Sequence, residues 1–579
     1  MSRKSPSSTR GTRPFAVSAA VAFALALACR DSTAPGGPPG SLSLAPGNSS
    51  TITNGQQIDI SGGSSGGEYL LVVTDTLGID SGATSAYRIA ASGTAAAGTV
   101  SAPARSIAST GSSAAMLATP ATAKLDVSFG ARLNERARRR LVPLFSAARR
   151  AQAARQAVVP GRSTSSIPST AQVGDIYTMN VSPAPCDSIE NHPARVVAVG
   201  TNAIVAVDTL NPPGGFSSAD YTRFAANFDT LVYPLDVENF GAPTDIDKNG
   251  HVILLFTRAV NELTPAHQDF YVGGFFFERD LFPATNAPGL QGCPGSNLAE
   301  MFYLLSPDPT GAVNGNVRTA AFIDSLTTSL IGHEFQHLIN ASRRMYVNNA
   351  DDFEVVWLNE GLSHIAEELL FYREAGLSPR SNISASTIRS STRSLNAFNN
   401  DQSANASRYI EYLSDPTKNS PIRFDDSLAT RGATWDFLRY AADRKVGSGG
   451  NESSVWQALV NSSANGVVNL RTVFASDLGG WLRDWSVSQY TDDVVTNLSA
   501  AYTQPSWNWH SVLQALGPNG VAYPLPVQPL PTTGTSGVLI PGSSAYYRFA
   551  VPANGVASLT VTGNGGGTGV SQGVVVRLR

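Results

Sequence analysis

The sequence predicts an α+β protein, in which a mixed sheet is followed by a helical region and small β-sandwich-like modules flank both ends. Runs rich in Val, Ile and Leu between about 167 and 260 are typical of buried strands. Apolar residues at helical spacing dominate from about 320 to about 500. Short strand-like segments separated by Gly- and Ser-rich turns occur at 49–93 and again after 524.

The composition narrows the class of protein. The 579 residues are enough for several domains, and the formal net charge is −3. A net charge this close to zero produces no strongly positive surface potential, so nucleic acid is not an expected partner. Charged residues make up only 15%, while there are 52 Gly and 35 Pro, a loop-rich composition found in many secreted bacterial proteins.

The N-terminus predicts export. Basic residues precede an apolar run at 15–28 that is too short to span a bilayer, so 1–28 is read as a signal peptide. The segment Leu-Ala-Leu-Ala-Cys ending at Cys29 resembles a lipobox, which predicts lipidation of Cys29 and a lipid anchor. Ordinary secretion with cleavage nearby is the alternative. Both place the mature protein outside the cytoplasm, as an envelope lipoprotein or a secreted protein.

Composition shifts divide the rest of the chain. We expect a flexible tether, a small β module, a low-complexity linker, the main globular domain, and a Pro-rich linker with a C-terminal β module that can be incomplete. Their expected ranges are 29–48, 49–93, 94–165, 166–523 and 524–579. The linker contains a strongly basic helix at about 129–158. That helix either packs on the globular domain as a solvated helix or belongs to a propeptide-like segment.

The stretch 329–374 carries the chemistry. His333, Glu334 and His337 form an H-E-x-x-H motif. Positions i and i+4 share one face of a helix, so both imidazoles can reach one metal ion, with Glu334 beside it as a general base for water. Apolar neighbours predict a buried helix, in which these polar groups are costly unless a metal satisfies them.

A third ligand is expected from the next helix. Glu360 in W-L-N-E-G follows His337 by 23 residues (360 − 337), which allows one turn and a return alongside the first helix. Two histidines and one glutamate form a catalytic zinc set whose fourth position is left to water. His364 and Glu367 continue the polar line of Glu360 along this helix.

H-E-x-x-H followed by W-L-N-E-G resembles the gluzincin metallopeptidases, and the chain is most similar to the hyicolysin-type neutral metallopeptidases of bacteria. The similarity runs from about 175 to about 502 and includes DTLVYPLDVENFG, YVGGFFFERDLF and W-L-R-D-W. It implies a zincin-like catalytic domain acting on proteins or peptides. It also implies zinc on His333, His337 and Glu360, with Glu334 as the base.

The chain departs from the family pattern at His364, where many gluzincins have Asp or a small residue. His364 either supports the ligands or the transition state, or is a satisfied polar residue between helices. Gluzincins often stabilise the oxyanion with a Tyr or His from a C-terminal helical lobe. The candidates here are Tyr409, Tyr412, Tyr440, Tyr490 and His510.

The segment YVGGFFFERD has two possible interpretations. It is either an edge strand that pairs with extended substrate, as the resemblance implies, or a plain core strand in which Gly273 and Gly274 form a bulge.

Two further features concern metals and cysteines. Asp245, Asp247 and Asn249 in D-x-D-x-N-G resemble the first half of a calcium loop, although its twelfth position is Phe256 rather than Glu. Ca²⁺ is therefore a candidate, and a tight Asx-rich turn is the alternative. Of the 3 cysteines, lipidation of Cys29 would leave Cys186 and Cys293, which we expect to form a disulfide outside the cytoplasm.

Two functions remain in competition. The first is an exported zinc endopeptidase of the gluzincin type. The second is a surface binding or adhesion lipoprotein whose metal is not catalytic. A structural zinc site is closed by four ligands, and His364 is the residue that could close this one.

Overall fold

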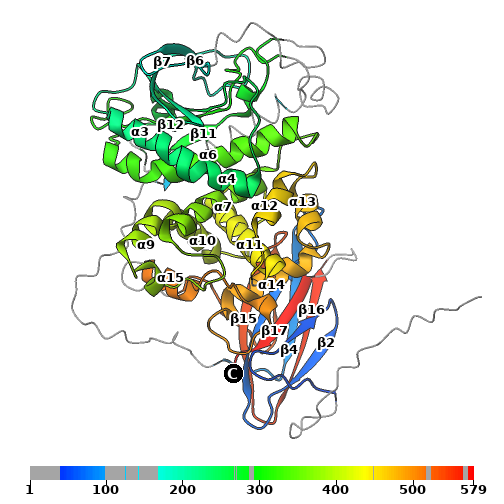
Figure 1. Cartoon of the computed structure of the whole chain (residues 1–579). Coiled ribbons are helices and arrows are strands. Elements are labelled where there is room, and N and C mark those ends of the chain that lie inside the picture. The colour runs from blue at the N-terminus through cyan, green and yellow to red at the C-terminus, as the bar shows by residue number, and fades with distance from the viewer. Residues whose placement is uncertain are drawn as a thin grey trace, which may run out of the picture. The chain divides into compact units, whose positions relative to one another are not determined.

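The computed structural model describes residues 40–97, 124–125, 141, 167–266, 268, 270–285, 292–447, 449–516, 523–564 and 571–579. The protein is a mixed α+β molecule with two large groups of strands and a helical region (Figure 1). The predicted signal peptide and Cys29 lie outside the described residues, as does the predicted basic helix except for Leu141, which is helical and buried.

The first group of strands is a sandwich built from both ends of the chain. One sheet has the order β1-β17-β3-β15-β13 and the other β14-β4-β16-β2. The N-terminal strands are β1 Ser49–Ile52, β2 Gln57–Ser61, β3 Gly67–Asp75 and β4 Ser85–Ser92. The C-terminal strands are β13 Gln528–Pro529, β14 Thr535–Leu539, β15 Ser544–Val551, β16 Val556–Asn564 and β17 Ser571–Arg577.

Strands from the two ends of the chain interleave in both sheets. In the described sheets no two N-terminal strands are neighbours, because β17 separates β1 from β3 and β16 separates β2 from β4. Alternate side chains of both sheets meet in one apolar core, which includes Ile60, Leu71 and Phe549. The sequence treats 49–93 and 524–579 as separate modules, whereas their strands pair with one another in the structure. Pairing between positions this far apart leaves no local signal.

The second group of strands is a six-stranded sheet in the order β11-β12-β9-β8-β7-β6. Its strands are β6 Ile176–Asn180, β7 Asn191–Val199, β8 Ala203–Asp208, β9 Val252–Thr257, β11 Gly274–Phe276 and β12 Met301–Leu305. The central strands β8, β9 and β12 are parallel, while β11 runs antiparallel to β12 and lies at the edge. A separate short strand, β10 Phe270–Tyr271, pairs in parallel with β5 Lys124–Leu125.

Helices make up most of the remaining described structure. Those between the strands are α3 Ser218–Asn227, η2 Phe228–Val232, α4 Tyr233–Phe240, α5 Arg258–Glu262 and η3 Glu278–Leu281. The long pair that follows is α6 Ala320–Tyr346 and α7 Val356–Ala375. Next come α8 Ala385–Ile388, α9 Thr392–Ala397, η4 Phe398–Gln402, α10 Ser403–Ser414 and α11 Leu428–Val446. The last are α12 Ser453–Val460, α13 Gly466–Val473, α14 Leu478–Thr491, η5 Ala500–Tyr502 and α15 Trp509–Leu516. Within the described ranges, none of these helices combines the length and apolarity needed to cross a membrane.

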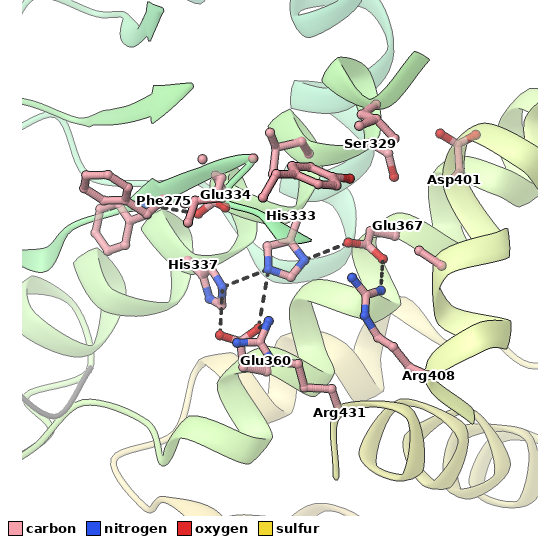
Figure 2. A pocket seen from close by; sticks show the side chains of 18 of the residues that line it. Phe275, Ser329, His333, Glu334, His337, Glu360, Glu367, Asp401, Arg408 and Arg431 are labelled. Atoms are coloured by element: carbon pink, nitrogen blue, oxygen red, sulfur yellow. Dashed lines mark hydrogen bonds and ion pairs between the residues drawn. The ribbon is translucent and has the colours of Figure 1, made fainter. Parts of the chain in front are cut away.

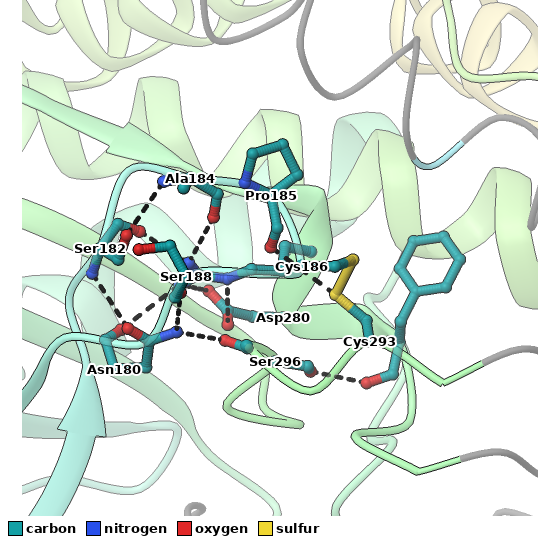
Figure 3. Close-up of a disulfide and its surroundings, with 12 residues drawn as sticks. Asn180, Ser182, Ala184, Pro185, Cys186, Ser188, Asp280, Cys293 and Ser296 are labelled. Carbon is teal, nitrogen blue, oxygen red and sulfur yellow. Dashed lines mark hydrogen bonds and ion pairs between the residues drawn. A yellow bond between two sulfur atoms is a disulfide. The ribbon is translucent and has the colours of Figure 1, made fainter.

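A disulfide joins Cys186 and Cys293, whose Cα atoms are 4.8 Å apart across 107 positions of sequence (Figure 3). It connects the loop after β6 to the loop before β12. Buried Arg279 reinforces the same region by donating hydrogen bonds to the carbonyl oxygens of Ser182 and Ala184 at 2.6 and 2.9 Å. The bond therefore ties together two loops beside the sheet.

The interleaved sandwich makes a prediction about truncation. Deleting residues 524–579 would remove both hydrogen-bonded neighbours of β3, so the N-terminal strands should unfold as well. Limited proteolysis of the truncated chain should cut within 49–93, a region that we expect to resist cleavage in the full chain. Continued resistance of 49–93 after truncation would show that it folds as an independent module.

Candidate metal centre

The H-E-x-x-H motif lies in the middle of α6, and both imidazoles point toward α7 (Figure 2). Nε2 of His333 and Nε2 of His337 are 3.1 Å apart. The carboxylate of Glu360 on α7 completes the group, with Oε2 at 3.5 Å from His333 Nε2 and Oε1 at 3.8 Å from His337 Nε2. All three side chains are buried.

These separations fit one metal ion. Ligand bonds of about 2.0–2.1 Å in a tetrahedral arrangement place ligand atoms about 3.3 Å apart. The three side chains can therefore hold a metal, and no fourth side chain belongs to this group in the described part of the chain.

The partners of the two histidines leave Nε2 free for a metal. His333 donates from Nδ1 to Glu367 Oε1 at 2.9 Å. Ser363 donates to Gln336 at 2.7 Å, so its oxygen accepts from His337 Nδ1 at 3.0 Å. With both Nδ1 atoms acting as donors, two Nε2 lone pairs face each other across 3.1 Å. That arrangement needs a cation or a proton between them.

The carboxylates around His333 favour its protonation. Burial opposes a charge on His333, but the nearby carboxylates of Glu360 and Glu367 raise its pKa to about 10. Burial lowers the pKa of His337 to about 4. A metal ion would replace the proton, because a histidine ligand binds in its neutral form.

Glu334 lies beside the ligands and does not belong to their group. Its Oε2 accepts a hydrogen bond from the backbone N–H of Phe276 on β11 at 2.7 Å. Burial raises the pKa of Glu334 to about 7. A carboxylate with such a pKa is suited to taking and returning a proton near neutral pH.

His364 lies behind the ligands. Its side chain is fully buried, and Nδ1 is 3.1 Å from Glu367 Oε2. It does not line the cavity at the site. His333, His364 and Glu367 also form a group that could hold a metal. However, the Arg408 guanidinium lies 3.4 Å from Glu367, so a second cation there would be repelled.

A cavity of about 140 Å³ opens at the motif. One wall is formed by β10 and β11, which contribute Tyr271 and Gly274, and another by α6. From the helical region, Asp401, Arg408 and Arg431 line it. The predicted oxyanion candidates Tyr409, Tyr412, Tyr440, Tyr490 and His510 are all described, and none of them lines this cavity.

The edge strand presents backbone to the cavity. Gly273 accepts a hydrogen bond from Leu305 at 2.8 Å, so its carbonyl points inward to β12, while the N–H of Phe276 points outward to Glu334. Strand alternation then places the N–H and C=O of Gly274 on the outward side as well. A Cβ at Gly274 would lie 2.6 Å from the Tyr303 carbonyl oxygen, so this position requires glycine.

The predicted calcium residues are placed differently from the sequence expectation. Ligand atoms of Asp245, Asp247 and Glu300 lie within 4.8 Å of one another. The Asn249 amide instead donates to the Ile167 carbonyl at 2.8 Å and to Asp247 at 3.0 Å. Burial raises the pKa of Asp247 to about 7 and that of Glu300 to about 8. The Asx-type turn is also present, because Gly250 N–H donates to Asp245 Oδ1 at 3.2 Å.

The sequence assigned no role to several residues of these sites. For Glu367 the sequence contains one indication, because it continues the polar line of Glu360 at helical spacing. Arg408, Arg431 and Glu300 had none, because each reaches its site from an element distant in sequence.

Comparison with known proteins supports a metalloprotease relationship over part of the chain. No family model matches it. A stretch of 142 residues, 24% of this chain, is 30% identical to the neutral metalloprotease ShpI of Staphylococcus hyicus. The match covers 29% of that relative, so the two chains are comparable over less than a third of its length. It is also shorter than the 175–502 range over which the sequence resemblance was expected.

The acidic group at Glu300 gives a prediction about calcium. If Asp245, Asp247 and Glu300 bind Ca²⁺, adding Ca²⁺ to chelator-treated protein at fixed zinc should raise the melting temperature. Binding at about 100 times Kd contributes about 2.7 kcal/mol. Glu300→Gln should abolish this response, whereas Glu262→Gln on the exposed face of α5 should keep it. An unchanged melting curve for the wild type would leave only the turn.

Proposed function

We propose that this chain is an exported zinc endopeptidase of the gluzincin type. The observation that carries the proposal is the convergence of His333, His337 and Glu360 in a cavity that also contains Glu334 and an edge strand. The relationship to a neutral metalloprotease over 142 residues supports the same function.

The chemistry follows from the roles of the side chains. His333, His337 and Glu360 would hold the zinc, which would supply a Lewis acid for a peptide carbonyl and would lower the pKa of water toward about 7. Glu334 takes the proton from the attacking water and returns it to the leaving amine. The Phe276 N–H holds the Glu334 carboxylate in one orientation while it does so.

An extended polypeptide is the substrate that suits this cavity. The outward N–H and C=O of Gly274 can form main-chain hydrogen bonds to an added strand. The neighbouring β10 already accepts an extended segment of this chain, Lys124–Leu125, in parallel pairing. Tyr271 and Arg408 line the same cavity. We propose that these two side chains contact the substrate carbonyl, in place of the oxyanion candidates expected from the helical lobe.

A binding protein with a closed metal site is less well supported. Closure would require His364 to join the ligands, but its Nδ1 faces Glu367 and it is absent from the His333–His337–Glu360 group. We propose instead that His364 orients Glu367, which in turn orients His333.

The separation of roles between the two glutamates can be tested directly. Glu334→Gln keeps size and hydrogen bonding but cannot take the proton. Zinc content should therefore stay near that of the wild type, while single-turnover cleavage of a denatured protein falls by about two to four orders of magnitude. Glu360→Gln should lower zinc affinity, with activity partly restored by excess zinc. His333→Ala and His337→Ala should lose metal and activity together.

The decisive outcome concerns Glu334. Normal cleavage by Glu334→Gln would eliminate the mechanism and favour a metal-stabilised binding protein. The assay should include the chelator-treated wild type as a control, since residual cleavage there would come from a contaminating enzyme.

Anchoring is a separate proposal that rests on the N-terminal sequence. We propose that the chain is exported and lipidated at Cys29. Cys29→Ser should move the protein from the membrane fraction to the soluble fraction, as followed by immunoblotting of fractionated cells. A wild-type protein found only in the soluble fraction would refute the anchor while leaving export intact.

A further inference from the structure

A buried arginine touches the metal-binding carboxylate. Arg431 lies on α11 and places Nη1 2.8 Å from Glu360 Oε2 (Figure 2). The direction of the N–H does not satisfy hydrogen-bond geometry, and Oε2 has no aligned donor among the described residues. The contact is therefore an ion pair that holds the carboxylate and leaves its lone pair available.

A second carboxylate fixes the arginine. Asp426 accepts from Arg431 Nε at 2.7 Å and from Nη2 at 2.9 Å. Such a bidentate pair fixes the plane of the guanidinium as well as its position. Asp426 precedes α11 in a left-handed backbone conformation with φ of 50°.

The helices that carry Glu360 and Arg431 pack closely at this level. A Cβ at Gly361, next to Glu360, would lie 2.5 Å from a Thr434 methyl carbon. A Cβ at Gly432, next to Arg431, would lie 2.3 Å from the Arg408 backbone. These glycines let α7 and α11, and α10 and α11, approach closely at the level of the ion pair. The backbones that carry Glu360 and Arg431 are thereby held close together.

The same two helices form a second Glu–Arg pair. Glu368 and Arg439 lie eight residues after Glu360 and Arg431 (368 − 360 and 439 − 431), and their Oε2 and Nε atoms are 2.9 Å apart. Eight residues correspond to about 12 Å along a helix. Glu368 also accepts from Trp507 at 2.7 Å and from Tyr372 at 3.0 Å. The Glu368 carboxylate is thus surrounded by hydrogen-bond donors from the protein, whereas the Glu360 carboxylate faces the two histidines.

The charges of the buried side chains also favour a role for Arg431 at Glu360. Asp426 and Glu360 are two buried carboxylates, and the Arg431 guanidinium contacts both. Without Arg431, no guanidinium would lie between these two buried negative groups. An uncompensated buried charge is strongly destabilising.

We infer that Arg431 is a positioning residue for the metal centre. Held by Asp426, it keeps the Glu360 carboxylate where His333 and His337 converge. This inference rests on the proposed metal site, but its test does not depend on peptide cleavage.

The test measures metal binding by the full chain. Zinc affinity is determined by competition with a chromophoric chelator, and the coordination geometry is followed by the visible absorption of the Co²⁺-substituted protein. Arg431→Met should weaken zinc binding by about 10–100-fold, the range found when partners of metal ligands are removed. It should also alter the Co²⁺ spectrum. Arg431→Lys should show an intermediate effect, because an ammonium cannot contact Asp426 and Glu360 in the same way.

Two further variants separate positioning from packing. Asp426→Asn does not touch Glu360, yet it should weaken zinc binding in the same direction by releasing the arginine. Arg439→Met removes a buried arginine from the same helix, so it should lower the melting temperature while leaving zinc affinity and the Co²⁺ spectrum unchanged. If Arg431→Met does not fold, Arg431→Lys and Asp426→Asn decide the question.

Wild-type zinc affinity and Co²⁺ spectrum in both Arg431→Lys and Asp426→Asn would overturn the inference. Equal weakening by Arg439→Met would also overturn it, because the effect would then be general to helix packing. Failure of the zinc-loaded wild type to cleave any polypeptide would instead refute the proposed function and leave the metal-binding result standing.

Discussion

The meeting of two imidazole lone pairs and a carboxylate between α6 and α7 is the constraint on which the surrounding lobe depends. Polar groups at this depth are stable only if each has a partner of opposite charge or a hydrogen bond. Glu367 and Ser363 take the outer nitrogens of the histidines, while Arg431 takes the outer side of Glu360. These partners contact the histidines and Glu360 on the sides that face away from one another. The two Nε2 atoms and the Glu360 carboxylate therefore converge on a space that suits a cation.

The sequence contains much of this centre because its ligands follow local rules. Spacing of i and i+4 places His333 and His337 on one helical face, and the 23-residue gap to Glu360 suffices for a helix return. The α+β class was also predictable, since strand and helix periodicities occupy different parts of the chain. The same local reading indicated that His364 and Glu367 share the side of Glu360, although not that both would be buried.

What the sequence could not predict depends on contacts between distant segments. The alternation of N- and C-terminal strands in the sandwich brings together positions such as Leu71 and Tyr547, which no periodicity connects. Helix α11 carries several Arg and Asp residues, a composition that the sequence alone would place at the surface. Instead its charged residues, including Arg431, Asp436 and Arg439, are buried with partners on other elements. A charged residue reads as exposed until its partner is known.

The two Glu–Arg pairs between α7 and α11 have the same packing arrangement but different surroundings. Glu368–Arg439 joins the helices, whereas Glu360–Arg431 lies at the candidate metal site. Both pairs are buried and both join the same helices, so the arginine alone does not distinguish them. The difference lies in what else reaches the carboxylate. At Glu368, tryptophan and tyrosine donors complete the shell, and the pair can only hold the helices together. At Glu360 those donors are missing and two imidazoles take their place. An ion pair becomes part of a metal centre when the protein positions the carboxylate without satisfying it.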